Sequence, residues 1–177
     1  MADFPVRSMR LDGGHAVYST VSLTQMLTVA GASTAWPSAN LAIFVPIYVA
    51  EPCTVYKMVA GAGATAGSNN FDIGIYDQSG NRLVSSGATA KGSSVEHVID
   101  VTDTRIGPGI YYLAMSADGT GNYVLVTPSG TTPVPLQKAR MLGTLEAATS
   151  YVLPATATMV ARTGPLIPNI AAYTRRT

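Results

Sequence analysis

The sequence predicts an all-β protein, a jelly-roll-like antiparallel β-sandwich with an extended N-terminal arm. In several short stretches, apolar and polar residues alternate with a period of two, which is typical of half-buried strands. The 17 Gly and 11 Pro residues separate these stretches at short intervals, as the tight turns of a sandwich require. A chain of 177 residues is also long enough to bury one core without metal ions or disulfide bonds.

The clearest strand covers residues 70–76, and the turn-forming residues 77–81 after it predict a hairpin into Leu83 and Val84. Apolar side chains take one face of this strand and polar or small ones the other, with Phe71, Ile73 and Ile75 against Asp72, Gly74 and Tyr76. We therefore expect a half-buried strand. The residues expected in the core of the sandwich are Phe71, Ile73, Ile75, Leu113 and Val124.

The same patterns predict further strands on both sides of this hairpin. They cover residues 21–29, 41–49, 54–60, 95–101, 110–115, 123–126, 156–161 and 168–174. Residues 41–49 are apolar almost throughout, which is typical of a strand buried on both faces. For residues 22–29 a helix is the alternative, but the Thr and Val content favours a strand. His97 falls on the apolar side of its strand, so we expect a hydrogen-bonded core residue.

Loops and turns are predicted where Gly, Ser, Asp and Asn gather. Residues 61–69 and 88–94 are the glycine- and serine-rich loops, residues 102–104 form a turn, and residues 118–122 form a hairpin turn into the next strand. A short helix near the C-terminus is predicted over residues 137–148, although Gly143 weakens it.

These elements divide the chain into three parts. Residues 1–35 form an N-terminal arm and strand, and residues 36–127 form the sandwich core. Residues 128–177 form a C-terminal segment that completes the sandwich or contacts neighbours.

The composition points to an assembly. Charged residues make up 12% of the chain, about half of the usual quarter, while hydrophobic residues reach 47%. A surface so poor in charge gives little protection against association, so we expect partners to cover much of it. A Ser- and Thr-rich soluble sandwich is the alternative source of such a composition. The net charge of +1 supplies no basic field for nucleic acid, and the apolar run 41–50 is too short for a membrane helix.

The sequence predicts no enzyme, no cofactor and no metal site. Asp72 and Asp77 would face opposite sides of a straight strand, and Asp77, Asp103 and Asp118 fall in predicted turns. No G-x-S-x-G elbow, zinc-ligand spacing or Gly-Lys-Ser/Thr phosphate loop is present. Residues 118–122 have the Asp and Asn spacing of a calcium loop, but the downstream bidentate Glu is missing, which favours a plain turn.

Three stretches of the chain resemble a known group of proteins. They are WPSANLAIFVP at 36–46, DIGIYDQSGNRLVSSG at 72–87 and PGIYYLA at 108–114. They are similar to virion structural proteins of tailed bacteriophages that have jelly-roll or β-sandwich folds. This resemblance implies a non-enzymatic virion protein, made in the host cytoplasm. We expect a capsid decoration, or cement, protein that binds between capsid subunits.

The resemblance also implies partners. The major capsid protein or another virion protein is expected to bind the chain, and the chain is expected to form a homo-oligomer, with a trimer favoured. The alternative is a receptor-binding module of a tail or head fibre that recognises a host glycan. The nine Tyr, against three Phe and one Trp, fit either a sugar-stacking surface or packing against neighbouring subunits. Tyr111 and Tyr112 are adjacent on one strand, so they are expected to face opposite sides.

The N-terminal arm, residues 1–17, holds the candidate interface. It has too little periodic apolar content to fold alone, and ordering it costs roughly 1 to 2 kcal/mol per residue, which some surface must offset. We expect it to dock on a neighbouring subunit or on the capsid protein, with Arg7 and Arg10 as rim contacts. The predicted interface residues are Phe4, Val6, Arg7, Met9, Arg10 and Leu11. The alternative is that the arm folds back onto an edge strand of its own sandwich.

Overall fold

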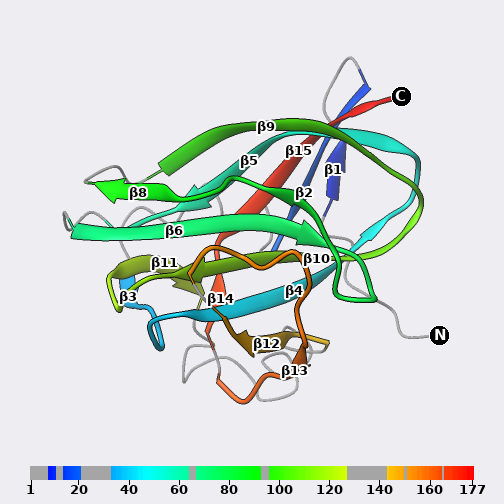
Figure 1. Ribbon diagram of the computed structural model, residues 1–177. Coiled ribbons are helices and arrows are strands. Elements are labelled where there is room, and N and C mark those ends of the chain that lie inside the picture. The colour runs from blue at the N-terminus through cyan, green and yellow to red at the C-terminus, as the bar shows by residue number, and fades with distance from the viewer. Residues whose placement is uncertain are drawn as a thin grey trace, which may run out of the picture.

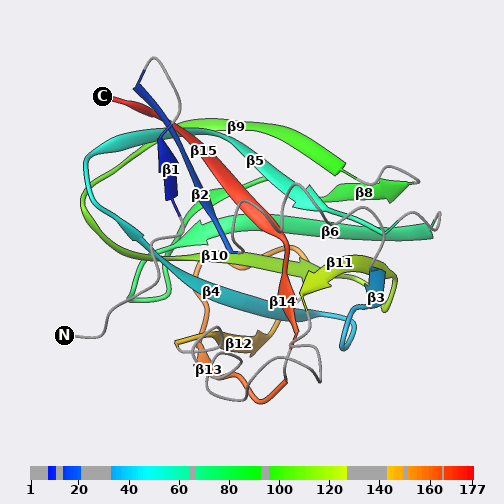
Figure 2. The same ribbon diagram turned by 180° about the vertical axis from the view of Figure 1, so that it is seen from behind.

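The computed structural model describes residues 8–10, 14–20, 33–63, 67–92, 96–126, 143–149, 151–164 and 166–177. Two antiparallel sheets face each other in a sandwich, and a small three-stranded sheet lies at one end (Figures 1 and 2). The described residues form strands and turns but no helix, and none of them belongs to a helix that could span a membrane. The all-β sandwich predicted from the sequence is therefore confirmed.

The five-stranded sheet has the order β1-β2-β15-β5-β9. Its strands are β1 (Ser8–Arg10), β2 (His15–Ser19), β15 (Ile170–Arg176), β5 (Cys53–Gly61) and β9 (Glu96–Ile106). The C-terminal strand β15 therefore lies in the middle of this sheet, between a strand from the N-terminal part and one from the centre of the chain.

The seven-stranded sheet has the order β13-β12-β4-β10-β6-β7, with β8 also paired to β6. Its strands are β13 (Val160–Ala161), β12 (Leu145–Ala148), β4 (Leu41–Val49), β10 (Gly109–Ala117), β6 (Gly67–Tyr76), β7 (Arg82–Ser85) and β8 (Thr89–Gly92). The small sheet comprises β14 (Ile167–Pro168), β11 (Asn122–Val126) and β3 (Ser33–Ala35).

The main core fills the space between the two large sheets. The predicted core residues Phe71, Ile73, Ile75 and Leu113 are all fully buried there, which confirms the expected burial. The side chain of Val124 lies outside the described part of the chain. Trp36 and Tyr123 close one end of this core with edge-to-face ring contacts, at a centroid distance of 5.6 Å. Such ring pairs stabilise a core by more than their buried area alone.

Strand β6 is buried on both faces, whereas its alternating pattern predicted burial on one. Its outer face is covered by residues 151–157, which we call the strap and which cross the outside of the seven-stranded sheet (Figure 1). The strap is held to the β6–β7 turn by backbone hydrogen bonds of 2.8 and 2.9 Å, from Arg82 N to Ala155 O and from Ala157 N to Gly80 O. Polar residues on β6 are thus buried because a distant segment covers them.

Several local predictions are wrong because tertiary pairing overrides local composition. Strand β6 begins at Gly67 and strand β8 covers Thr89–Gly92, both inside predicted loops. Strand β9 continues through the predicted turn at 102–104, with a bulge opposite β5. Strand β11 pairs with β3 and β14, so residues 118–122 connect two sheets and do not form a hairpin.

The C-terminal helix prediction also fails where it can be compared. Residues 145–148 form strand β12, because they pair with the apolar strand β4 along the edge of the sheet. Residues 143 and 144 are described and are not helical either, while residues 137–142 of the predicted helix and the predicted strand 21–29 lie outside the described residues.

Candidate functional site

The most elaborate polar site surrounds Asp72, on the outer face of β6. Both of its carboxylate oxygens accept hydrogen bonds, at 2.9 to 3.0 Å, from the hydroxyls of Ser85 and Ser86 and from the backbone N–H of Leu153. Asp72 is fully buried, so each of these bonds offsets the cost of removing its oxygens from water. Donors of the same chain thus satisfy both oxygens of the carboxylate. Asp72 therefore anchors the strap to the seven-stranded sheet.

Other groups fasten the strap on either side of Asp72. The Tyr76 hydroxyl donates to Pro154 O at 2.5 Å, the Ser116 hydroxyl donates to Tyr151 O, and the Arg82 guanidinium donates to Leu153 O. Burial raises the pKa of Tyr76, so its phenol remains a neutral donor. Three strands of the seven-stranded sheet thus hold backbone carbonyls of one crossing segment.

A second polar site lies at the edge of the main core. Lys91 is only 1% exposed, and its ammonium donates to Gly63 O at 3.1 Å and lies 5.9 Å from the centre of the Tyr123 ring. Burial lowers the pKa of Lys91. His97 packs against the Phe71 ring at 5.0 Å between centroids. Burial lowers the pKa of His97, while a hydrogen bond with the Lys91 backbone opposes that shift. The hydrogen bond is as expected from the sequence, but the side chain is only partly buried, and its Nε2 has no hydrogen-bond partner among the described residues.

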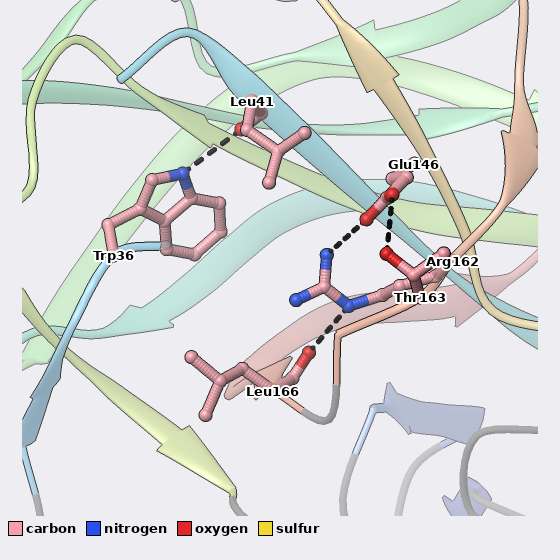
Figure 3. A network of polar contacts seen from close by, with 6 residues as sticks. All are labelled: Trp36, Leu41, Glu146, Arg162, Thr163 and Leu166. Atoms are coloured by element: carbon pink, nitrogen blue, oxygen red, sulfur yellow. Dashed lines mark hydrogen bonds and ion pairs between the residues drawn. The ribbon is translucent and has the colours of Figure 1, made fainter. Parts of the chain in front are cut away.

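A third site is the buried ion pair of Glu146 and Arg162 (Figure 3). The Nη1 of Arg162 lies 2.8 Å from Oε2 of Glu146, and its Nε donates to Leu166 O at 3.0 Å. The Arg162 side chain is 1% exposed, so burial lowers its pKa while Glu146 acts in the opposite direction. The Thr163 hydroxyl donates to Glu146 at 3.4 Å. These contacts join β12 to the segment that follows β13.

Three further ion pairs lie in the open, among residues of the five-stranded sheet and the turn before β5. They are Lys57 with Asp100 at 3.1 Å, Arg176 with Glu51 at 2.7 Å, and Arg175 with Asp103. Their side chains are between 40% and 82% exposed, so solvent screens them strongly.

The remaining acidic residues singled out by the sequence have separate structural roles. Asp77 caps its turn by accepting from the backbone N–H groups of Ser79 and Asn81 at 2.8 and 2.9 Å. Hydrogen bonds, first that of the Asn81 side chain, lower the pKa of Asp77. Asp118 instead accepts from the backbone N–H and the side-chain amide of Asn70 on β6, at 2.9 and 2.8 Å, so the predicted local turn bonding is confirmed for Asp77 but not for Asp118. Asp103, predicted in a turn, lies instead in β9. In the described part of the chain, no three His, Cys, Asp or Glu side chains form a group that could hold a metal ion.

Of the predicted interface residues, the structure places two. Met9 and Arg10 lie in β1, which pairs with β2 through Met9 opposite Val17 and Arg10 opposite Ala16. This is the fold-back arrangement that the sequence left open. It covers residues 8–10 and also arm residues 15–17, which lie in β2 and pair with β15 of the sandwich. Phe4, Val6, Arg7 and Leu11 lie outside the described residues. Docking of the arm on a neighbour stays a prediction.

The structure also shows exposed apolar side chains that the sequence did not single out. The large ones are Tyr48, Leu83, Val98, Val152 and Val160. All except Val98 belong to the seven-stranded sheet or its strap, and Tyr48 is 56% exposed. Tyr111 packs against the main core and Tyr112 against the cluster under the strap, so these neighbours face opposite sides as expected. Tyr48 lies near the end of the apolar run 41–49, beyond residues 41–44, which pair with β12. Its place near the end of that run was the signal in the sequence.

Comparison with known proteins adds no relative. No protein-family model matches the chain, and neither the curated proteins nor the solved structures include a match.

Proposed function

We propose that the protein is a non-enzymatic structural component of a bacteriophage virion, and that it acts as a capsid decoration protein. The observation that supports this proposal most is where the described charges lie. Only 12% of the residues are charged, and three of them, Asp72, Lys91 and Arg162, have buried side chains that are hydrogen-bonded within the chain. These three residues are withdrawn from a surface that is already poor in charge, and large apolar side chains are exposed, all except Val98 on the seven-stranded sheet or its strap. Such a surface favours permanent association.

The mechanism we propose is thermodynamic. A protein that binds the assembled capsid but not free capsid subunits adds its binding free energy to the assembled state. Many copies on one lattice multiply this effect, since each copy holds neighbouring subunits together. The partners would be the major capsid protein and further copies of this chain, in a homo-oligomer for which the sequence resemblance favours a trimer. The site of action would be the virion.

The N-terminal arm is the proposed contact with the capsid or with a neighbouring copy. Tyr18 of β2 is buried in the main core, and Val17 is buried against Val59 and Ala171. A deletion that tests the arm must therefore stop before β1, which pairs with β2. Deleting residues 2–7 leaves the β1–β2 hairpin in place. We expect a domain with a nearly unchanged melting temperature that no longer binds purified particles. Unchanged binding by the shortened, folded chain would contradict the role of the arm.

A fibre-type module that binds host glycans is the second candidate, and the exposed Tyr48 supports it. Tyr48 on β4 and Tyr112 on β10 are diagonal neighbours on the outer face, two register positions apart, because Tyr48 is opposite Ile110 and Tyr112 is opposite Pro46. Tyrosine rings so placed can stack on sugars. Copy number in purified virions separates the two candidates. A decoration protein should occur at capsid-lattice numbers, whereas a fibre tip should occur in far fewer copies.

A further inference from the structure

The longest exposed sheet edge in the described part of the chain is strand β9. It pairs with β5 on one side only, over eleven residues, whereas the other edge strands of the three sheets have two to four residues. Figures 1 and 2 show β9 along the outer margin of the five-stranded sheet. An open edge of this length presents backbone N–H and C=O groups to a further strand.

The charges along β9 indicate which strand fits. Its outward side chains before the bulge are Glu96, Val98 and Asp100, and those after it include Asp103 and Arg105. Asp100 and Asp103 are already paired within the chain, with Lys57 and Arg175. The side chains of Glu96 and Arg105 form no ion pair or hydrogen bond with any residue that the structure describes. The two leftover charges are thus opposite in sign and stand at opposite ends of the same edge.

We propose that β9 pairs antiparallel with β9 of a second copy about a two-fold axis, with Glu96 of each copy opposite Arg105 of the other. Residues directly opposite on neighbouring antiparallel strands have Cβ atoms about 5 Å apart, within reach of an ion pair. The pairing joins the two five-stranded sheets of the copies into one. An isologous contact of this kind uses each complementary pair twice.

The alternative registers are less favourable. A shift by one residue puts outward side chains opposite inward ones, such as Glu96 opposite the core residue Ile106. A shift by two places Glu96 opposite Asp103 in one direction, and Asp100 opposite Asp103 in the other. Like charges directly opposite each other destabilise a pair of strands. In the proposed register the bulge lies at the two-fold axis, where Asp100 would be opposite the inward residue Val101, so the ladder forms only at the two ends of β9. At these ends outward residues are opposite each other, with Glu96 opposite Arg105 and Val98 opposite Asp103, and the ion pairs do much to fix the register.

This inference does not rest on the virion role, because the purified chain alone tests it. A two-fold contact gives dimers, or joins trimers in pairs if the trimer expectation also holds. Charge-reversal variants Glu96→Arg and Arg105→Glu each place like charges at both ends of the contact. We expect each to weaken association roughly tenfold or more, while the double swap Glu96→Arg/Arg105→Glu restores it. Raising ionic strength to about 0.5 M should also weaken the wild-type contact.

The measurement is the mass in solution by sedimentation or light scattering at about 100 µM chain, where even a weak contact is populated. Arg176→Glu is the matched control, since it changes the charge of the same sheet by the same amount as Arg105→Glu, but on β15, which β5 separates from β9, and its ion-pair partner Glu51 lies outside β9; its mass should equal the wild-type mass. Circular dichroism checks that each variant is folded, and neutral Glu96→Gln and Arg105→Gln replace any reversal that does not fold.

A monomeric wild type overturns the proposal, as does an oligomer whose mass the single reversals leave unchanged. A folded double swap that stays dissociated overturns it as well.

Discussion

The two large sheets differ in what lies on their outer faces, which point away from the core that they share. On the seven-stranded sheet the strap covers the outer side, and the polar groups beneath it, Asp72 among them, are buried and hydrogen-bonded. On the five-stranded sheet the ion pairs stand in solvent, as Lys57 with Asp100 does. The same residue types therefore stabilise very differently in the two places, because burial decides how much a charge interaction is screened.

The core shared by both sheets sets the largest expected effect. Ile75→Ala removes a fully buried side chain and leaves a cavity between the sheets. We expect a loss of about 2 to 5 kcal/mol in the free energy of unfolding, measured by urea denaturation. A loss near zero would show that the core collapses around the truncated side chain and is not closely packed.

The buried ion pair should come next. Arg162→Met leaves Glu146 partly buried without its cation and removes the bond to Leu166 O. We expect a loss of roughly 3 kcal/mol, because the remaining carboxylate has lost its partner but retains some solvent. The double variant Arg162→Met/Glu146→Leu should recover part of the loss in the same denaturation experiment. A double variant no more stable than the single one contradicts this explanation.

Asp72 tests the attachment of the strap. Asp72→Ala leaves the Leu153 N–H and two serine hydroxyls without their acceptor, at a cost of roughly 1.5 to 3 kcal/mol. Hydrogen exchange should show faster opening at Leu153 than elsewhere in the sheet. Asp77→Ala, which removes an exposed turn cap, is the control and should cost about 1 kcal/mol or less. Equal protection of Leu153 in both variants would argue against Asp72 as the anchor.

The exposed face should respond least to mutation. Lys57→Ala breaks the pair with Asp100, and we expect a loss of at most about 1 kcal/mol, reduced further by salt. A loss as large as that of Arg162→Met would remove the contrast between the two faces.

A pH slope should be the mildest effect. Because burial lowers the pKa of His97, the unfolded chain binds a proton at higher pH than the folded one. This contribution to stability is complete above the ordinary histidine pKa of 6.5 and is lost as pH falls through the folded value. We expect stability to decline below pH 6.5 in the wild type and to be flatter in His97→Gln. Asp77, whose pKa is lowered from 3.8, acts in a separate, more acidic window. Identical slopes in the two proteins would contradict the role of His97.

The sequence by itself determined the class of fold and much of the core. The alternation around Ile73 and the apolar run of β4 identify strands because a period of two needs no knowledge of the neighbours. The Asp77 turn was likewise predictable, since Asx bonding to the backbone is local.

The tertiary structure decided which polar residues are buried and what they bind. Asp72 lies on the polar face of its strand, and only the return of a segment 81 residues further along the chain buries it against Leu153. Strand β8 forms because it pairs with β6, although its segment is rich in glycine, and strand β12 forms because it pairs with β4, although its segment has a helical pattern. Tertiary contacts likewise bury Lys91 and Arg162. Such contacts depend on the whole topology, so they cannot be predicted from local composition.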